Sequence, residues 1–299
     1  MRSWELFVEE KAIFHSMDVT LEMELWKFHD IFFDEAAHSY TDSLGTEYTS
    51  VTKFVHQFSP EQDWDEIARK YVRKHNYDDV NKKLEKIPEP AAWPGQQGSL
   101  EDALPLLEKR ALIEAAAIVK VRAEWDQAGT KACALGTEVH AYMENQWKRK
   151  LYRPEKEPEG YEELSAVGLR AYTELSKRFV PIREEFIVCK PGWQLCGTID
   201  FLAYDAAKDR IVILDYKTNK EIKRENPFQQ CVGALAGLPD CNYITYCAQL
   251  STYKAILEAE TDIRIGGMAL VHIRKDGYSV IPCKDLSTQI KEHLDGKQA

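Results

Sequence analysis

A short apolar run that ends in an acid and a base constrains this chain more than any other stretch. Residues 211–214 are Ile-Val-Ile-Leu, an apolar and mostly β-branched run that favours a buried β-strand. Because side chains alternate across a strand, Asp215 and Lys217 are expected on one face and Tyr216 on the other. A core strand normally ends in a turn residue, so an acid and an amine directed at one place predict chemistry at the end of this strand.

Two further strand-like segments precede this run, at residues 182–189 and 197–204. The turns between the segments are short, so the strands are expected to be antiparallel neighbours. Asp200 lies in an apolar setting on the middle strand, and Glu185 lies on the first. Glu184 must point to the opposite face from Glu185, so at most one of these two glutamates joins a common site. Two acids and a lysine that converge on a sheet can hold a divalent metal and place a water beside it.

Composition and charge narrow the class of protein. With 299 residues, 44% hydrophobic and 29% charged, the chain is typical of a soluble globular protein of one large or two smaller domains. No apolar run approaches the roughly 20 residues of a membrane span, and the N-terminus lacks the apolar block of a signal peptide. These features predict a cytoplasmic protein, in the host cytoplasm if the source is a phage or virus, without a membrane partner. A net charge of −10 argues against coating nucleic acid by bulk attraction, but is compatible with a nucleic-acid enzyme that has a local basic groove.

The cysteines are odd in number and scattered, and no C-x-x-C pair occurs. This spacing predicts neither a zinc knuckle nor an iron–sulfur cluster. We therefore expect reduced, mostly buried thiols. The seven residues are Cys133, Cys189, Cys196, Cys231, Cys241, Cys247 and Cys283.

The N-terminal third of the chain predicts a hairpin followed by helices. The hairpin is expected at residues 38–48, and Thr49 or Ser50 can cap a helix that begins at Val51. A strongly charged helical segment follows at residues 63–86. Its basic residues form either a solvated helix face or a patch that contacts phosphates.

A Pro- and Gly-rich loop near residues 87–98 is the best candidate boundary in the chain. It divides an N-terminal extension of hairpin and helices, residues 1–98, from a catalytic core, residues 99–299. A helical hairpin can open the core, with its second helix interrupted at Gly129 and Gly136. The other predicted segments are a helix at 161–178, a polar loop at 221–243, a helix at 243–259, strands at 267–274 and 278–282, and a terminal helix.

Two short motifs lie on predicted helices. Gly136 and His140 are one helical turn apart, so the glycine leaves room beside the imidazole. Gln249 and Tyr253 place an amide and a phenol on one helix face. Each motif alone is weak, because a helical histidine is more often a surface or core residue and such pairs occur by chance in many helices.

The order of the motifs resembles that of the PD-(D/E)xK nuclease superfamily. More narrowly, the chain is similar to its RecB-type branch, which includes mitochondrial genome maintenance exonucleases. The resemblance covers residues 130–257 and, more loosely, residues 48–52. The motifs are Gly-Thr-x-x-His at 136–140, Glu185, Gly-x-x-Asp at 197–200, Asp-x-Lys at 215–217 and Gln-x-x-x-Tyr at 249–253.

The resemblance implies an α/β fold with a restriction-endonuclease-like core, in which helices flank a central mixed sheet. It also implies a metal site in which Asp200, Asp215, Glu185 and His140 are ligands and the backbone carbonyl of Tyr216 completes the shell. The metal is expected to be Mg²⁺ or Mn²⁺, since Mg²⁺ prefers carboxylate oxygens and retained waters. The chain departs from the family in lacking the four-cysteine iron–sulfur arrangement of some relatives, so no cluster is expected.

The remaining motif residues would act on the substrate. Lys217 would orient or help to deprotonate the attacking water, while Gln249, Tyr253 and Thr137 would position the scissile backbone or brace the site. The segment between Lys217 and Gln249 is long for the family, so residues 221–243 are expected to be an insertion near the substrate path.

These expectations predict a metal-dependent nuclease that hydrolyses DNA, acting as an exonuclease on single strands or DNA ends in replication, recombination or repair. A replication or recombination protein is its expected partner. The alternatives are a structure-selective or restriction-like endonuclease, and an inactive nucleic-acid-binding protein; the complete set of two acids and a lysine argues against the last. Candidate DNA contacts, each of which could instead be core or solvated surface, are Trp125, Tyr142, Trp147, Lys148, Arg149, Lys150 and Lys220.

Overall fold

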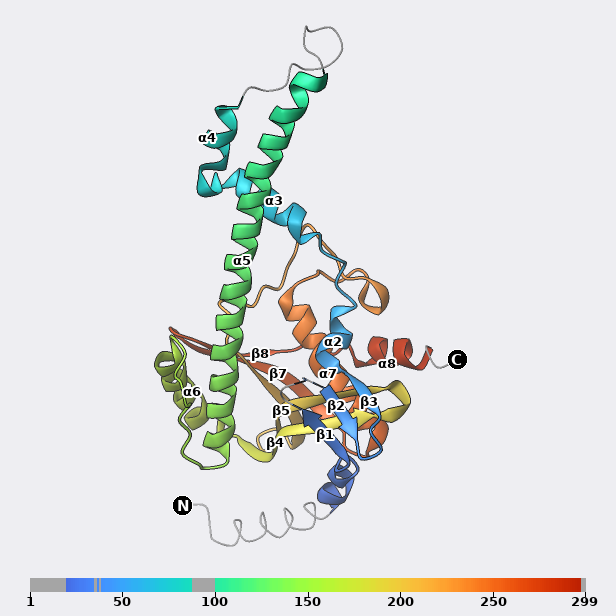
Figure 1. Cartoon of the computed structure of the whole chain (residues 1–299). Coiled ribbons are helices and arrows are strands. Elements are labelled where there is room, and N and C mark those ends of the chain that lie inside the picture. Colours follow the sequence, from blue (N-terminus) through green and yellow to red (C-terminus); the bar gives the residue numbers. More distant parts are fainter. Residues whose placement is uncertain (1–19, 35–36, 38, 88–99, 297–299) are drawn as a thin grey trace. The chain divides into compact units, whose positions relative to one another are not determined.

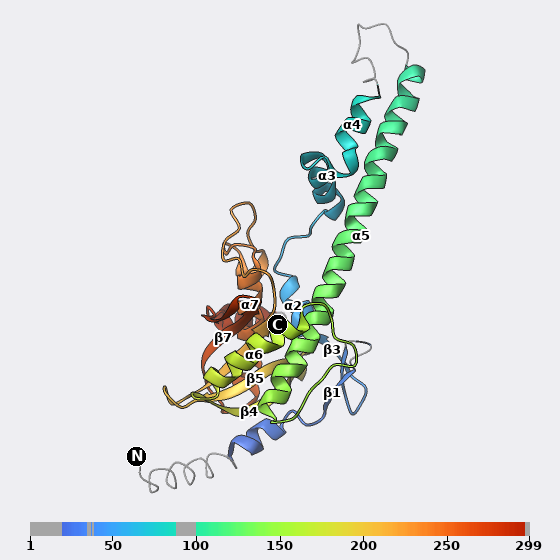
Figure 2. The same cartoon turned by 90° about the vertical axis from the view of Figure 1, so that its left-hand side faces the viewer.

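The computed structural model describes residues 20–34, 37, 39–87 and 100–296. Contacts divide the chain into two compact units, here called the sheet unit (Met1–Pro60 with Leu135–Ala299) and the helical unit (Glu61–Ala134). The boundary expected between residues 98 and 99 stays a prediction. By contacts, the N-terminal strands belong to the sheet unit, with the strands that carry the acids (Figures 1 and 2).

A mixed β-sheet forms the centre of the sheet unit. The pairs β3–β5 and β6–β7 are parallel, and the other pairs are antiparallel. The predicted mixed sheet and the antiparallel order of the three strands that carry the acids are therefore confirmed. Within the described residues, its eight strands are β1 (Ile31–Asp34), β2 (Ser39–Asp42), β3 (Glu47–Ser50), β4 (Phe179–Lys190), β5 (Leu195–Asp205), β6 (Arg210–Lys217), β7 (Ile265–Arg274) and β8 (Gly277–Pro282).

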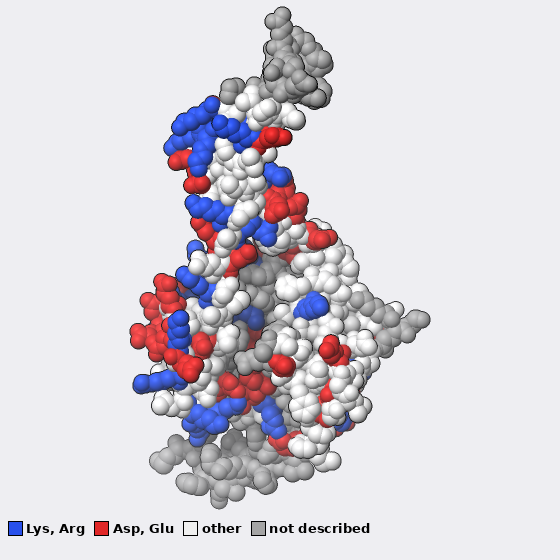
Figure 3. Space-filling view, viewed as in Figure 1, with Lys and Arg blue, Asp and Glu red and all other residues white. Residues whose placement is uncertain are grey.

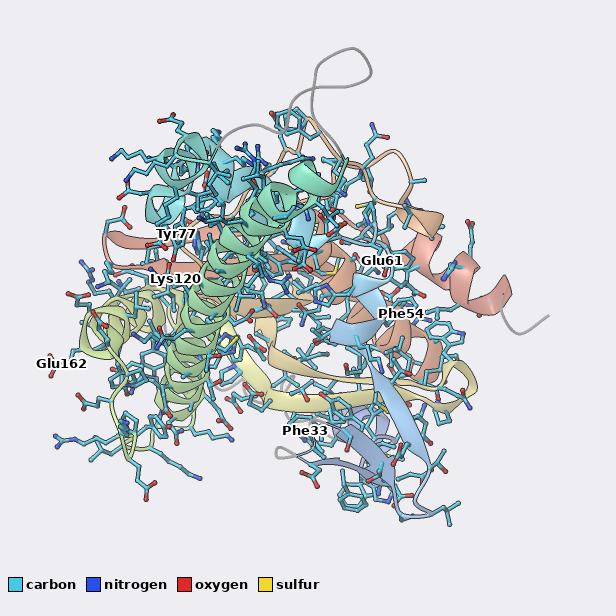
Figure 4. All side chains as sticks on the ribbon, turned by 45° about the horizontal axis from the view of Figure 1, so that its top comes forward. Phe33, Phe54, Glu61, Tyr77, Lys120 and Glu162 are labelled. Carbon is cyan, nitrogen blue, oxygen red and sulfur yellow. A yellow bond between two sulfur atoms is a disulfide. The ribbon has the colours of Figure 1, made fainter. Side chains whose placement is uncertain are left out.

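Helices cover both faces of this sheet. One apolar core packs α7 and α8 against it, and a second packs the end of α5 and α6 against the other face. Phe54 of α2 points toward α8, where its ring centroid lies 6.3 Å from that of His293 (Figure 4). None of the described helices is both long enough and apolar enough to cross a membrane. The α-helices are α2 (Val51–His56), α3 (Trp64–Lys74), α4 (Val80–Glu85), α5 (Leu100–Trp147), α6 (Tyr161–Leu175), α7 (Asn242–Glu260) and α8 (Ser287–Gly296).

The expected helical hairpin before residue 148 is wrong, because α5 is one helix of 48 residues. An isolated glycine costs a helix only about 1 kcal/mol relative to alanine, which is too little to interrupt a segment rich in strong helix formers. Gly136 has a packing role instead, since a Cβ there would lie 3.3 Å from Thr218 Oγ1. Of the two predicted helix caps, Thr49 and Ser50, the structure has Ser50: its hydroxyl accepts a hydrogen bond from the Lys53 amide over 3.1 Å.

The helical unit has its own small core. Ala68 and Val72 of α3 and Val80 and Leu84 of α4 pack against apolar residues of α5. Lys120 lies 5.5 Å from the centroid of the Tyr77 ring (Figure 4).

Lys and Arg side chains gather over α3 and α4 (Figure 3). Several of them are neutralised within the unit, however, as in the pairs Arg69–Glu66 and Arg73–Glu114. Exposed pairs of this kind are typical of a solvated helix face.

The expectation of reduced thiols is wrong for two cysteines, because Cys189 and Cys196 form a disulfide. They are paired residues on the adjacent strands β4 and β5, with their Cα atoms 4.0 Å apart. The disulfide could not be predicted from the spacing of the two cysteines in the sequence, because only the strand register brings their side chains together. Cys133 is exposed, whereas Cys231, Cys241 and Cys247 are buried as expected.

The sheet opens along one edge of β5. β3 pairs with the start of β5, at Leu195 and Cys196, whereas β6 pairs with it only from Phe201 onward. Between these two contacts, residues 197–200 of β5 pair with no described strand on that edge. Asp200 is the last residue of this unpaired stretch, and its side chain is 12% exposed.

Candidate metal-dependent active site

Three acids lie in one row across three neighbouring strands. β5 and β6 pair at Phe201 and Leu214, so Asp200 and Asp215 are the next residues after the last pair, where the strands separate. On the other side of β5, the register places Glu185 of β4 opposite Asp200. The three carboxylates that the sequence singled out thus come from adjacent positions in the sheet.

The Asp200 carboxylate is held by a backbone amide of β6. Its Oδ2 accepts a hydrogen bond from the Tyr216 amide over 2.8 Å, because β6 no longer pairs with β5 at this point. His140, from the last part of α5, places Nδ1 3.2 Å from the same oxygen. Donor atoms of His140, Glu185 and Asp200 all lie within 4.8 Å of one another. Two carboxylates and an imidazole at this spacing fit a divalent cation.

Asp215 is buried beside a lysine. The residue is 1% exposed, and within the described residues Oδ1 makes no hydrogen bond. Lys217 Nζ lies 2.5 Å from Oδ2, so the two side chains share a face as predicted. Burial raises the pKa of Asp215 to about 6, against the effect of Lys217. A buried carboxylate oxygen without a partner is costly, and a bound cation would satisfy it.

Lys217 keeps its charge in this environment. Burial acts to lower the pKa of Lys217, but the carboxylates of Asp215 and Asp200 outweigh burial and raise it above its ordinary value. Nζ also lies 4.8 Å from the centroid of the Tyr246 ring on α7, a cation–π contact that favours the ammonium. At neutral pH Lys217 is therefore a hydrogen-bond donor.

Tyr246 and its hydrogen-bond partners hold Lys217 in place, and the sequence motifs did not reveal them. Its hydroxyl donates to Asn219 Oδ1 over 2.7 Å, and Asn219 O lies 2.6 Å from Nε2 of the buried His272. Tyr246 precedes Gln249 by three residues, so helical spacing could have assigned it to the same face. His272 pairs with Lys217 between β6 and β7, which only the sheet register shows.

Glu185 has an unusual backbone and a perturbed carboxyl group. Its φ of +46° lies in a region that non-glycine residues rarely occupy and that is enriched at functional sites. Although the residue as a whole remains exposed, loss of hydration at the carboxyl group and the charges of Asp200 and Glu144 raise the pKa of Glu185 to about 8. Glu144 follows His140 by one helical turn and could have been found by that spacing.

This raised pKa predicts that the metal-free protein loses stability as pH increases. Between about 4.3, the ordinary value for glutamate, and about 8, native Glu185 keeps a proton that the unfolded chain has lost. Stability then falls with pH, because the native state binds more protons. We expect the melting temperature measured in EDTA to fall less steeply between pH 6 and pH 8 in Glu185→Gln than in the wild type.

Glu163→Gln, at an exposed glutamate of α6, is the matched control and should keep the wild-type slope. The comparison starts at pH 6 because Asp215 contributes to the slope at lower pH. Parallel curves for Glu185→Gln and the wild type would contradict the assigned titration.

Gln249 and Tyr253 occupy the face of α7 next to β5. Gln249 Nε2 donates to the Tyr253 hydroxyl over 2.9 Å, and Tyr253 is 3% exposed. Tyr253 packs on Gly197, where a Cβ would lie 2.6 Å from its Cε1 and 3.0 Å from the side chain of Val51. The glycine of the Gly-x-x-Asp motif is thus required by close packing between α2, β5 and α7.

Gly197→Ala is therefore expected to displace Tyr253. We expect a loss of about 1–3 kcal/mol in the free energy of unfolding, the usual cost of overpacking. Gly129→Ala is the control: a Cβ there meets no atom within 4 Å, and alanine should stabilise α5 by up to about 1 kcal/mol. Urea unfolding of both variants measures the effect, and equal stability of Gly197→Ala and wild type would contradict this packing role.

Of the residues predicted to contact DNA, the three aromatic side chains pack against other aromatic rings. Trp147 is buried, stacks on Phe201 at 4.3 Å and donates to the Tyr216 hydroxyl over 2.7 Å, so it belongs to the core. Trp125 packs edge-on against Tyr71 in the helical unit, and Tyr142 packs edge-on against Tyr161.

The candidate cations and Thr137 lie at the surface. Lys148 forms an ion pair with Glu144, while Arg149, Lys150, Lys220 and Thr137 are exposed. Their contacts with DNA stay a prediction.

Fold and donor set together define a class of protein: an α/β domain with a carboxylate-rich site for a divalent cation at an opening in its sheet. A family model described as the PD-(D/E)XK nuclease superfamily matches residues 117–295, more than half of the 299 residues, and the chain belongs to this superfamily. No curated protein matches the chain. Superfamily membership makes it a nuclease-type phosphodiesterase with a nucleic-acid substrate and a requirement for a divalent metal.

Proposed function

We propose that this protein is a metal-dependent deoxyribonuclease that acts as an exonuclease on single strands or DNA ends. The observation that carries the proposal is the row of Glu185, Asp200 and Asp215 at the sheet opening, with Lys217 beside it. The order of the motifs, which resembles that of RecB-type and mitochondrial genome maintenance exonucleases, supports the exonuclease assignment. Replication, recombination or repair is the proposed setting, with a protein of that pathway as partner and the cytoplasm as location.

In this proposal the metal ligands are Asp200, Asp215, Glu185 and His140, with the Tyr216 carbonyl. The unsatisfied Oδ1 of Asp215 and the close donor atoms of the other three side chains support this set. Mg²⁺ or Mn²⁺ bound there would lower the pKa of a coordinated water and stabilise charge on the phosphodiester.

The protein's own residues orient the reacting groups. Lys217, whose Nζ lies 2.5 Å from Asp215 Oδ2, is proposed to donate a hydrogen bond to a phosphate oxygen or to orient the attacking water. Gln249 and Tyr253 brace β5 through the contact with Gly197. Thr137, exposed near the end of α5, is proposed to contact the substrate backbone.

The test is cleavage of matched linear and circular DNA, single- and double-stranded, with Mg²⁺ or Mn²⁺. We expect linear single strands to be degraded and circles to survive, with one polarity revealed by blocking the 5′ or the 3′ end. Cleavage of circles would replace the exonuclease by an endonuclease. Preference for RNA would change the substrate, and absence of any cleavage with either metal would overturn the proposal.

A further inference from the structure

The loop between β6 and α7, residues 218–241, carries an aromatic side chain that the proposed site does not use. Phe228 is 95% exposed, the highest value among the large apolar side chains of the described residues. A single exposed apolar side chain is common on protein surfaces. Three further features of this loop distinguish Phe228: a fixed frame, neighbouring cations and attachment to the candidate active site.

The loop is held in one conformation by its own hydrogen bonds. Asn226 Nδ2 donates to Asp240 O over 2.7 Å, and its Oδ1 accepts from the Phe228 amide over 3.1 Å. The Cys231 amide donates to Leu238 O over 2.8 Å, closing the loop behind Phe228. The exposed ring is thus presented from a fixed frame, so that little conformational entropy would be lost when a ligand binds.

Exposed cations precede Phe228 in the same loop. Lys220, Lys223 and Arg224 form no ion pair with any described carboxylate, although Glu221 lies between Lys220 and Lys223 in the sequence and Glu225 follows Arg224. Arg224 instead lies over the Tyr243 ring, with its Cζ 5.0 Å from the ring centroid. In a chain with a net charge of −10, unpaired cations in the same loop as an exposed aromatic ring indicate an anionic ligand.

The loop is attached to the candidate site at both ends. Asn219, two residues after Lys217, bonds to Tyr246, whose ring contacts the Lys217 ammonium. At the other end, the Tyr243 amide donates to Lys223 O over 3.2 Å. Tyr243, which holds the cationic segment, precedes Tyr246 by three residues on α7, a rise of about 4.5 Å along the helix axis.

We propose that this loop binds single-stranded nucleic acid on its way to the acids, with Phe228 stacked on an unpaired base and Lys220, Lys223 and Arg224 on phosphates. Stacking needs a base whose face is free, which a duplex does not offer along its length. The inference rests on the proposed function and adds to it a binding surface for single strands outside the row of acids.

Fluorescence anisotropy with labelled oligonucleotides in EDTA measures this binding without cleavage. For Phe228→Ala we expect the Kd for a single strand to rise about 5- to 100-fold, the usual effect of losing one stacked base. Phe228→Trp should retain affinity because it retains a stacking surface. Leu44→Ala is the matched control, since Leu44 is 89% exposed in the β2–β3 turn and should not affect binding. Lys223→Ala should reduce the salt dependence of log Kd by about 0.7.

Two outcomes overturn the inference: an unchanged single-strand Kd in Phe228→Ala, or an equal loss of duplex affinity. The failures of the two proposals can be distinguished. A wild type that binds single strands through Phe228 but cuts nothing with Mg²⁺ or Mn²⁺ refutes the nuclease proposal alone. A wild type that cuts DNA while Phe228→Ala binds normally refutes the role of the loop alone, and a protein partner would then be its occupant.

Discussion

Asp200→Asn is expected to abolish cleavage by removing a metal ligand while leaving the fold intact. Asparagine keeps the size of the side chain and an oxygen that can accept from the Tyr216 amide, but it loses the charge that a cation requires. Outer-shell partners of metal sites contribute about 10- to 100-fold to affinity or activity, so a ligand should cost more than about 100-fold. Single-turnover cleavage and Mn²⁺ titration calorimetry on the same preparation measure both effects.

Glu174→Gln, at an exposed glutamate of α6 that pairs with Lys177, should behave as the wild type in both measurements. The assignment of Asp200 would be lost if Asp200→Asn bound Mn²⁺ as tightly as the wild type. A variant that lost Mn²⁺ affinity but kept cleavage would show that the reaction does not need this site.

Lys217→Ala should separate catalysis from binding. The ammonium lies 2.5 Å from Asp215 and donates hydrogen bonds, so its loss removes a charged donor from the reacting groups. Removing one such donor typically costs about 10²- to 10³-fold in kcat. We expect the Kd for a single strand to change less than threefold, while Mn²⁺ affinity stays the same or rises because Asp215 is freed.

Lys208→Ala in the turn between β5 and β6 is the control for loss of a lysine, and it should leave kcat unchanged. If Lys217→Ala cut DNA at the wild-type rate, Lys217 would be reduced to a structural partner of Asp215. If instead it lost metal and DNA affinity together, its role would lie in assembling the site.

The strands could be predicted because their side chains follow local rules. The run at 211–214 and the alternation of Asp215 and Lys217 depend only on the period of a strand, and both agree with the structure. The predicted interruption at Gly129 and Gly136 overestimated the cost of an isolated glycine, which at about 1 kcal/mol relative to alanine does not end α5. The disulfide likewise depends on register across β4 and β5.

For the site, the sequence indicated the acids and the lysine but not the side chains that hold them in place. Motif order placed Asp200, Asp215 and Lys217 together, as the sheet does. The contact of Tyr246 with Lys217 and the contact of His272 with Asn219 depend on tertiary packing between α7, β6 and β7. The positive φ of Glu185 has no local signal either, since glutamate rarely adopts that conformation.

The Tyr216 amide, which lies just beyond the last paired residues of β5 and β6, is a spectroscopic probe of the site. The Tyr216 amide donates to the Asp200 carboxylate instead of to a strand carbonyl, so its proton senses the charge on that oxygen. Titration with Mg²⁺ should therefore shift the amide resonance of Tyr216 in a ¹⁵N-labelled sample, in proportion to the fraction of sites filled. The interrupted ladder of hydrogen bonds thus provides a reporter of metal binding that needs neither substrate nor turnover.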